Sequence, residues 1–216
     1  MTGRVAGVDE AGKGPVLGSM VAACVLARPA DLPDGVGDSK DIAPERREAL
    51  DRTIRDAGDV AVGVATVPVA RIDDPETDMN ALTVAAQAEA VSDVARDGLH
   101  VVADAGDTDA ERFGRRLADA VSADVSVEAA HGADADHPVV GAASVVAKVA
   151  RDAHVATLAE EYGRDVGSGY PSDPVTREFL AEYVAEHSEL PDCARASWAT
   201  CDDVLAAAEQ SSLAEF

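Results

Sequence analysis

The sequence predicts an α/β protein with a mixed sheet, an alternating second half and an all-helical C-terminal part. Three observations support this class. Strand patterns dominate the first third of the chain, helical and strand patterns then alternate, and only helical patterns follow the break at Gly163–Gly169. A chain of 216 residues suits one domain with a small appendage.

The expected strands are short apolar runs between turn residues. Val16–Leu26 is continuously apolar after a Gly/Pro turn, and Val60–Val67 is rich in Val and stops at Pro68. The full set of expected strands is Arg4–Val8, Val16–Leu26, Val60–Val67, Leu99–Ala103 and Val125–Glu128.

The expected helices have apolar residues at helical spacing and recognisable ends. Asp78 to about Arg96 shows this spacing and stops before Gly98, while Pro44 and Pro138 each mark a helix start. The full set of expected helices is Pro44–Asp56, Asp78–Arg96, Ala110–Val121, Pro138–Tyr162, Pro174–His187 and Cys201–Gln210.

The charge is strongly acidic. Forty-one acidic residues against eighteen basic ones give a net charge of −23, and the acids are spread along the whole chain. Such acidity usually opposes nucleic acid as a partner. It also keeps a surface hydrated in a salt-rich cytoplasm, where the Debye length falls to about 3 Å at about 1 M salt. The global charge therefore indicates where the protein lives more than what it binds.

The basic residues are more informative about function than the net charge. Fifteen are Arg and three are Lys, and the three lysines, Lys13, Lys40 and Lys148, all lie in motif-like stretches. We interpret them as retained for a task. The alternative is chance retention on solvated faces.

Cysteine content and hydropathy indicate the compartment. Three cysteines without a C-x-x-C pair fit a reducing cytoplasm and neither a disulfide framework nor a zinc site. The sequence shows no signal peptide and no apolar run of about 18 residues. We therefore expect a cytoplasmic protein that does not span a membrane.

Four acids lie at informative positions of the expected strands and helices. Asp9 and Glu10 lie between a short apolar strand and a glycine-rich turn, where Asp9 is expected to end its strand, and Asp104 ends a later strand. Asp134 precedes the helix that begins at Pro138, whose dipole favours an anion. Hard divalent ions such as Mg²⁺ prefer carboxylate oxygens, so phosphoryl chemistry is the first interpretation. The alternatives are a plain polar turn at residues 9–10, a loop-start role for Asp104 and a surface position for Asp134.

A phosphate-binding P-loop is a second interpretation of the first segment. Gly7, Gly12 and Lys13 have the required G-x-x-x-x-G-K spacing. Position 14, however, is Gly where that loop needs a hydroxyl, and two acids lie inside the loop. Both features argue against a nucleotide hydrolase.

Three further residues are candidate substrate contacts. Ser144 and Lys148 are four residues apart and share a helix face, which suits a hydroxyl-plus-ammonium grip on phosphate or an ordinary helix surface. Tyr170 is one of few aromatic residues and lies in a Gly/Pro-rich turn. Its ring could stack on a base or sugar, or cover the core.

Taken together, these segments resemble ribonuclease HII, the type 2 ribonuclease H family, in its archaeal form. The joint order of the motifs is more specific than any one of them. The resemblance rests on Gly7–Pro15, Asp38-Ser39-Lys40, Val102–Ala105, His131–Asp134, Pro138–Lys148 and Gly167–Pro174.

The resemblance implies a ribonuclease H-like mixed five-stranded sheet with flanking helices and a helical C-terminal extension. It places two Mg²⁺ or Mn²⁺ ions on Asp9, Glu10, Asp104 and Asp134. The implied enzyme hydrolyses the RNA strand of RNA–DNA hybrids and cuts 5′ of single ribonucleotides in duplex DNA, leaving 3′-OH and 5′-phosphate ends. Such an enzyme serves DNA replication and ribonucleotide excision repair.

The resemblance also implies substrate contacts. In this family the turn that follows the acid pair reads Gly-Arg-Gly and senses the ribose 2′-OH, and a tyrosine packs at the RNA–DNA junction. The matching residues are Gly12, Lys13, Gly14 and Tyr170, with Ser39, Lys40, Ser144 and Lys148 as further contacts. Lys13 keeps the charge but loses the planar guanidinium. Many relatives also have a lysine where this chain has Gly132.

Residues 210–216 fit the Q-x-x-L-x-x-F pattern of peptides that dock on the sliding clamp of replication, proliferating cell nuclear antigen. Gln210, Leu213 and Phe216 are the pattern residues, and a frayed tail is the alternative. We expect a monomer with a catalytic domain at 1–165, a helical substrate-binding region at 166–209 and the tail at 210–216. The competing function is a non-catalytic sliding-clamp or nucleic-acid-binding adaptor.

Overall fold

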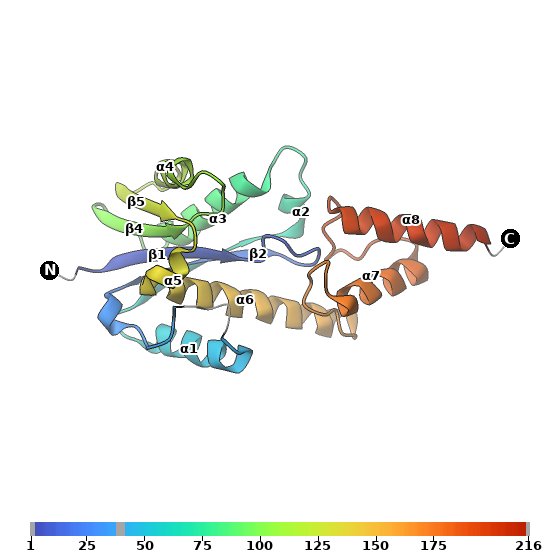
Figure 1. Ribbon diagram of the computed structural model, residues 1–216, viewed down its shortest axis with the longest axis horizontal. Coiled ribbons are helices and arrows are strands. Elements are labelled where there is room, and N and C mark those ends of the chain that lie inside the picture. The colour runs from blue at the N-terminus through green and yellow to red at the C-terminus, as the bar shows by residue number, and fades with distance from the viewer. Residues whose placement is uncertain (1–2, 38–41, 215–216) are drawn as a thin grey trace. The chain divides into compact units, whose positions relative to one another are not determined.

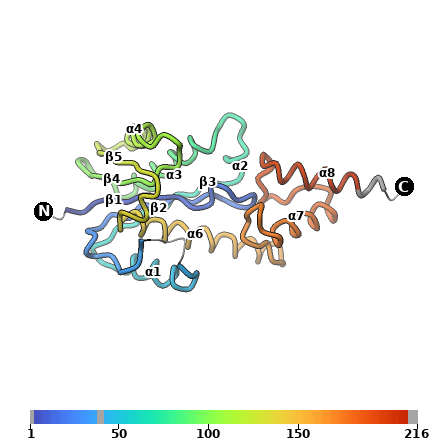
Figure 2. Tube along the Cα trace, viewed as in Figure 1, coloured from blue at the N-terminus to red at the C-terminus, as the bar shows by residue number. Residues whose placement is uncertain are grey.

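The computed structural model describes residues 3–37 and 42–214 (Figures 1 and 2). Ser39, Lys40 and Phe216 lie outside the described residues. The chain divides into two compact units. The first comprises 1–11, 21–66 and 79–150, and the second comprises 12–20, 67–78 and 151–216.

The first unit contains a five-stranded sheet of order β3-β2-β1-β4-β5. Strand β1 pairs antiparallel with β2 and parallel with β4, and β4 pairs parallel with β5. The mixed five-stranded sheet that the sequence predicts is therefore confirmed. The strands are β1 (Val5–Ala11), β2 (Met20–Ala27), β3 (Ala61–Val67), β4 (Leu99–Asp104) and β5 (Val125–Ala130).

Helices cover both faces of this sheet. On one face, α1 (Pro44–Asp56) and the first half of α6 (Pro138–Tyr162) enclose a core in which Val25 of β2 meets Ile54. On the other face, α3 (Met79–Ser92) contacts β1 and α4 (Ala110–Ala120) contacts β5. Figure 1 shows these two helix layers on opposite sides of the strands. Two short helices, the 3₁₀ helix Pro29–Asp31 and α5 (Ala133–Asp136), complete the unit.

The second unit is built around helices. The second half of α6, α7 (Pro174–His187) and α8 (Ala199–Ala214) enclose a core that contains Leu17, Phe179 and Leu180. Phe179 makes an edge contact with Tyr162, with ring centroids 5.3 Å apart. The short helix α2 (Val69–Ile72) belongs to this unit. The helical C-terminal extension is thus confirmed.

Several predicted boundaries are wrong. Strand β1 continues through Asp9 to Ala11, so Asp9 lies within the strand and does not end it. Strand β2 begins at Met20 and not at residue 16, because Gly18 adopts a φ of +79° and Leu17 makes only an isolated bridge with Ala194. Helix α3 ends at Ser92, four residues early, where the chain tightens into a turn. The short helices α2, α5 and Pro29–Asp31 were not predicted, and α8 extends beyond its predicted limits at both ends.

The cysteines are buried and free. Burial raises the pKa of the Cys24 thiol far above its ordinary value, which makes Cys24 a poor nucleophile. Cys193 and Cys201 are likewise buried thiols. Across the described ranges, no helix is both long enough and apolar enough to cross a membrane.

Helix α6 approaches the sheet very closely at Gly7. A Cβ atom on Gly7 would lie 2.2 Å from the Val139 carbonyl carbon and 2.4 Å from the Val140 nitrogen, both backbone atoms of α6. We predict that Gly7→Ala lowers the free energy of unfolding by at least about 2 kcal/mol, because backbone cannot yield as a side chain can. Urea unfolding in concentrated KCl measures this. The control is Gly58→Ala, whose Cβ would meet nothing within 4 Å. Equal stability of the two variants would contradict the close approach.

Candidate functional site

The adjacent acids Asp9 and Glu10 point to opposite faces of the sheet. Side chains alternate along a strand, and both acids lie inside β1. Asp9 reaches Ser144 on α6, whereas Glu10 accepts a hydrogen bond from Gln87 on α3. The alternative of a plain polar turn is therefore wrong for both residues.

Asp9 is a desolvated carboxylate. Its side chain is buried, with 5 % of the residue exposed, and burial raises its pKa to about 6. The hydrogen bond from Ser144 and the charge of Lys148 oppose this shift, and the charge of Asp104 adds to it. The Glu10 backbone N–H also donates to Asp9 Oδ1 at 2.7 Å.

Ser144 and Lys148 form a relay that supports Asp9. The Lys148 ammonium donates to the Ser144 hydroxyl oxygen, and Ser144 in turn hydrogen-bonds Asp9. The predicted shared helix face is therefore confirmed. Ser144 is fully buried, whereas Lys148 is half-buried. The hydroxyl is thus directed to the carboxylate, and the ammonium supplies the positive charge behind it.

Glu10 and Asp104 are joined by Gln87. The Gln87 amide nitrogen donates to Glu10 Oε2 at 2.7 Å and to the backbone oxygen of Asp104 at 3.1 Å. Gln87 is fully buried on α3, and its own Oε1 is buried without a hydrogen-bond partner. Because both neighbours are acceptors, the amide must present its NH₂ group to them. Gln87 therefore fixes Glu10 at the end of β4.

Asp104 also organises the segment that carries Asp134. Asp104 Oδ1 accepts from the backbone N–H groups of Gly132 at 2.7 Å and Ala133 at 3.2 Å. These groups begin α5, where Gly132 adopts a left-handed φ of +68°. Asp134 follows on α5 and is only 4 % exposed, so the alternative that it is a surface acid is wrong.

The four predicted acids thus belong to one unit and are linked to each other. Strands β1 and β4 are parallel neighbours, with Val8 opposite Ala103, so Asp9 and Asp104 follow at adjacent positions. Within residues 3–37 and 42–214, no three His, Cys, Asp or Glu side chains already form a group arranged to hold a metal ion. The donor set nonetheless suits a hard divalent cation, because it consists of carboxylate oxygens whose mutual repulsion a cation would relieve.

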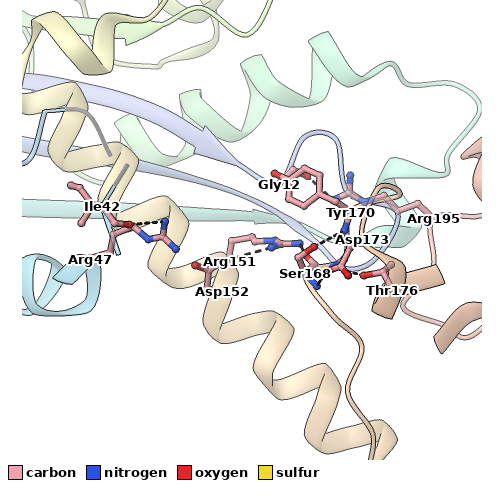
Figure 3. Close-up of polar contacts among 11 residues, drawn as sticks. Gly12, Ile42, Arg47, Arg151, Asp152, Ser168, Tyr170, Asp173, Thr176 and Arg195 are labelled. Atoms are coloured by element: carbon pink, nitrogen blue, oxygen red, sulfur yellow. Dashed lines mark hydrogen bonds and ion pairs between the residues drawn. The ribbon is translucent and has the colours of Figure 1, made fainter. Parts of the chain in front are cut away.

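The predicted substrate-contact residues Gly12, Lys13, Gly14 and Tyr170 lie in the second unit. Tyr170 is 41 % exposed, and no other large hydrophobic side chain among the residues whose burial is described is as exposed. The Arg151 guanidinium lies 5.3 Å from its ring centroid and donates to the Ser168 carbonyl (Figure 3). The alternative that this ring covers the core is therefore wrong.

The turn that carries Tyr170 is held by hydrogen bonds and by a glycine with positive φ. Ser168 N–H donates to Asp173 Oδ2 at 2.7 Å (Figure 3). Gly169 N–H donates to the Thr176 hydroxyl at 2.9 Å. The Gly169 carbonyl accepts from the Val16 N–H at 2.8 Å. Gly169 adopts a φ of +80°, which L side chains rarely tolerate. Tyr170 is thus held next to the segment that follows the glycine-rich turn.

Four residues of these two units were missed by sequence reasoning: Gln87, Arg151, Arg195 and Trp198. A buried Gln within the apolar face of a helix was the available signal for Gln87. The signal for Trp198 was that it is the single Trp of the chain and lies three residues after an Arg. No pattern in the sequence singles out Arg151 among fifteen arginines.

The solved structures that resemble this chain establish its class. Ribonuclease H2 from Pyrococcus horikoshii OT3 matches with a TM-score of 0.85 and 35 % identity, covering 95 % of this chain and 99 % of that one. Ribonuclease HII from Archaeoglobus fulgidus, solved as a complex with PCNA, matches with a TM-score of 0.79 and 36 % identity over 92 % and 95 % of the two chains. The fold extends to Bst-RNase HIII, solved in complex with Mn²⁺, at 23 % identity and a TM-score of 0.78, covering 97 % and 71 %. The sheet and its helices have the ribonuclease H fold.

The sequence comparisons give the family. The model of the family described as Ribonuclease HII matches residues 6–201. A ribonuclease HII from the halophilic archaeon Haloarcula marismortui is 70 % identical over 210 residues, covering 97 % of this chain and 99 % of the relative. The chain belongs to the ribonuclease HII family and is a nuclease. The resemblance predicted from the motifs is confirmed, and the P-loop interpretation is wrong, since strand β2 and not a helix follows the Gly12–Gly14 turn.

The burial of Asp9 predicts a cost in stability that the site imposes on the metal-free protein. With the pKa raised from 3.8 to about 6, the folded state binds more protons than the unfolded state between these values, so stability falls as pH rises through that window. We predict that Asp9→Asn raises the free energy of unfolding at pH 7 by about 1–3 kcal/mol. Urea unfolding in KCl with EDTA measures the difference, which should vanish near pH 4. Asp119→Asn, at an exposed position, is the control and should change nothing. A destabilised Asp9→Asn at pH 7 would contradict the argument.

Proposed function

We propose that this enzyme hydrolyses the RNA strand of RNA–DNA hybrids and cuts 5′ of single ribonucleotides in duplex DNA. The observation that carries the proposal is the buried Asp9 carboxylate, which has the charge of Asp104 beside it. An acid held in this way is strained unless a cation is bound. Asp9, Glu10, Asp104 and Asp134 are the residues that would hold two Mg²⁺ or Mn²⁺ ions.

When bound, such ions would supply activation of the attacking water and stabilisation of the leaving 3′-oxygen. The chain's own residues prepare the carboxylates for this. Lys148 and Ser144 lower the pKa of Asp9 against the effect of its desolvation, and Gln87 holds Glu10 with an amide hydrogen bond. Because the 3′-oxygen of the preceding nucleotide would be the leaving group, the P–O3′ bond would break, leaving a 3′-OH on that nucleotide and a 5′-phosphate on the ribonucleotide.

We assign substrate recognition mainly to the second unit, with additional contacts from Ser39, Lys40 and Lys148 of the first. Gly12, Lys13, Gly14 and Tyr170 would contact the ribose and its phosphates, because the 2′-OH distinguishes RNA from DNA and an exposed ring can stack on a sugar or base. Lys148 is the proposed phosphate contact on α6, whereas Ser144, also predicted to contact substrate, hydrogen-bonds Asp9. Ser39 and Lys40 are retained as proposed contacts.

The cleavage assay tests the proposal directly. Wild-type enzyme with Mg²⁺ or Mn²⁺ in concentrated KCl should make a single cut 5′ of one ribonucleotide in a DNA duplex. We expect Asp9→Asn and Asp104→Asn each to lower kcat by at least about 100-fold, because each removes several kcal/mol of charge stabilisation. The matched control is Glu128→Gln, an exposed acid on β5. Absence of any cut by the folded wild type would leave a non-catalytic nucleic-acid-binding or clamp-binding adaptor as the better account.

We also propose that residues 210–216 bind the sliding clamp, proliferating cell nuclear antigen. The Archaeoglobus fulgidus relative was solved in complex with PCNA. In this chain Gln210 is exposed on α8 and Leu213 falls within the same helix. A helical turn that places Leu213 and Phe216 three residues apart could fill one apolar pocket.

Deletion of residues 210–216 should abolish binding to the clamp while cleavage of a short duplex stays within about twofold of wild type, since the tail makes no proposed contact with the acids. Surface plasmon resonance with immobilised clamp measures the first effect. Substitution of Ser211 and Ser212 by Ala, at positions outside the Q-x-x-L-x-x-F pattern, is the control and should bind normally. Unchanged clamp binding by the deletion variant would refute the assignment.

The cellular setting completes the proposal. We place the enzyme in the cytoplasm as a monomer, acting in DNA replication and ribonucleotide excision repair. Three buried, free thiols are compatible with a reducing compartment.

A further inference from the structure

All three carbonyl groups of the Gly12–Gly14 turn are bound by two side chains from a distant part of the sequence. Arg195 Nη2 donates to the Gly12 carbonyl at 2.6 Å (Figure 3). Arg195 Nη1 donates to the Lys13 carbonyl at 3.1 Å. Trp198 Nε1 donates to the Gly14 carbonyl at 3.3 Å. We name Arg195 and Trp198 together the carbonyl clamp.

Arg195 is itself immobilised. It is fully buried, its Nε donates to the Gly18 carbonyl at 2.9 Å, and its backbone N–H donates to the Val16 carbonyl at 2.8 Å. Its guanidinium also lies 5.1 Å from the Trp198 ring centroid. Three carbonyls around one planar group require the several fixed N–H donors of an arginine, which a lysine cannot reproduce.

A carboxylate fixes the segment that carries the clamp. Asp73, which follows α2, accepts from the backbone N–H groups of Ala196 at 2.8 Å and Ser197 at 3.0 Å, and from the Ser197 hydroxyl at 2.5 Å. The clamp residues on either side of this pair are therefore held by both their own contacts and their backbone. A mobile surface loop would show none of these connections.

The clamp determines which side of the turn presents its N–H groups. A trans peptide directs its C=O and N–H in opposite directions, and the described residues contain no cis bond. With the Gly12 and Lys13 carbonyls directed at Arg195, the N–H groups of Lys13 and Gly14 point away from it. Tyr170 lies beside Gly14, because a Cβ atom on Gly14 would be 3.8 Å from Tyr170 Cε1.

We propose that Arg195 and Trp198 are positioning residues for ribonucleotide recognition, which hold the turn so that its N–H groups face the ribose and phosphate of the substrate. The inference rests on the proposed function, which assigns this turn to substrate contact. Neither clamp residue touches substrate in this account. Their effect is on the preference for a ribonucleotide, exerted through the backbone of Gly12–Gly14.

The test uses Trp198→Phe, which keeps an aromatic ring and removes only the Nε1 donor, and Arg195→Lys, which keeps the charge and loses the planar donor set. Both are made in an Asp104→Asn background so that the duplex is not consumed. Fluorescence anisotropy with Mg²⁺ in concentrated KCl gives Kd for a DNA duplex with one ribonucleotide and for the all-DNA duplex of the same sequence. The matched control is Arg164→Lys, which alters surface ion pairs with Glu182 and Glu186 in the same unit.

The preference is the Kd for the all-DNA duplex divided by the Kd for the duplex with one ribonucleotide. We expect this Kd ratio to fall about 3- to 10-fold in Trp198→Phe and further in Arg195→Lys, with the control unchanged. A variant that is merely destabilised loses active protein, which lowers the binding amplitude and leaves the Kd ratio intact. An unchanged ratio in Trp198→Phe, or no preference before the clamp is altered, would overturn the inference.

Wild-type cleavage, measured separately, distinguishes the two proposals. Cleavage 5′ of the ribonucleotide together with an unchanged Kd ratio in Trp198→Phe refutes the clamp alone. A ratio that falls in Trp198→Phe while the wild type fails to cut supports the clamp and refutes the catalytic proposal.

Discussion

The close approach of helix α6 to strand β1 is the constraint on which the acidic site depends. Only a residue without a Cβ atom allows the α6 backbone at Val139 and Val140 to approach Gly7 so closely. The same helix carries Ser144 to Asp9, two residues further along the strand and on the same face. A larger residue at position 7 would displace α6 and leave a buried carboxylate without its hydroxyl donor. Packing at one glycine thus determines the electrostatics of its neighbour.

Buried acids make the site costly and also define its chemistry. Asp9 carries a raised pKa because burial outweighs the help that it receives from Ser144 and Lys148. Glu10 takes its support from the opposite face, through Gln87 on α3. A well-packed core would have neutral residues at these positions, so the structure stores free energy here that a bound cation would release. The proposed metal chemistry and the predicted instability of the metal-free protein have this common origin.

The sequence predicted the order of elements well, because hydrophobic periodicity and Pro or Gly boundaries are local properties. It placed Pro174–His187 at both ends and the helix at Pro138–Tyr162 likewise. It erred where tertiary contacts override a local pattern, as in residues 16–19, where Leu17 makes an isolated bridge with Ala194 in place of a strand. The four acids were named through family resemblance, whereas Gln87 was not, because its role arises only when α3 packs on β1. The carbonyl clamp was hidden for the same reason, since about 180 residues separate its donors from their acceptors.

The distribution of charge reconciles an acidic protein with a polyanionic substrate. A net charge of −23 repels phosphate at long range, but concentrated salt screens that repulsion within a few ångströms, about 3 Å at about 1 M. Salt equally screens surface lysines, which would lose most of their value for binding.

Arg151 and Arg195 are different, since they are 6 % and 0 % exposed and lie beneath Tyr170 and the Gly12–Gly14 turn within the second unit. Burial lowers the pKa of Arg195 to about 10, with the charge of Arg151 as a second cause, so Arg195 remains charged near neutral pH. Charges shielded from solvent are screened far less than exposed ones. A halophilic nuclease can therefore shed its surface lysines and keep its attraction for phosphate, provided that the remaining cations lie inside the protein behind the backbone groups that meet the substrate.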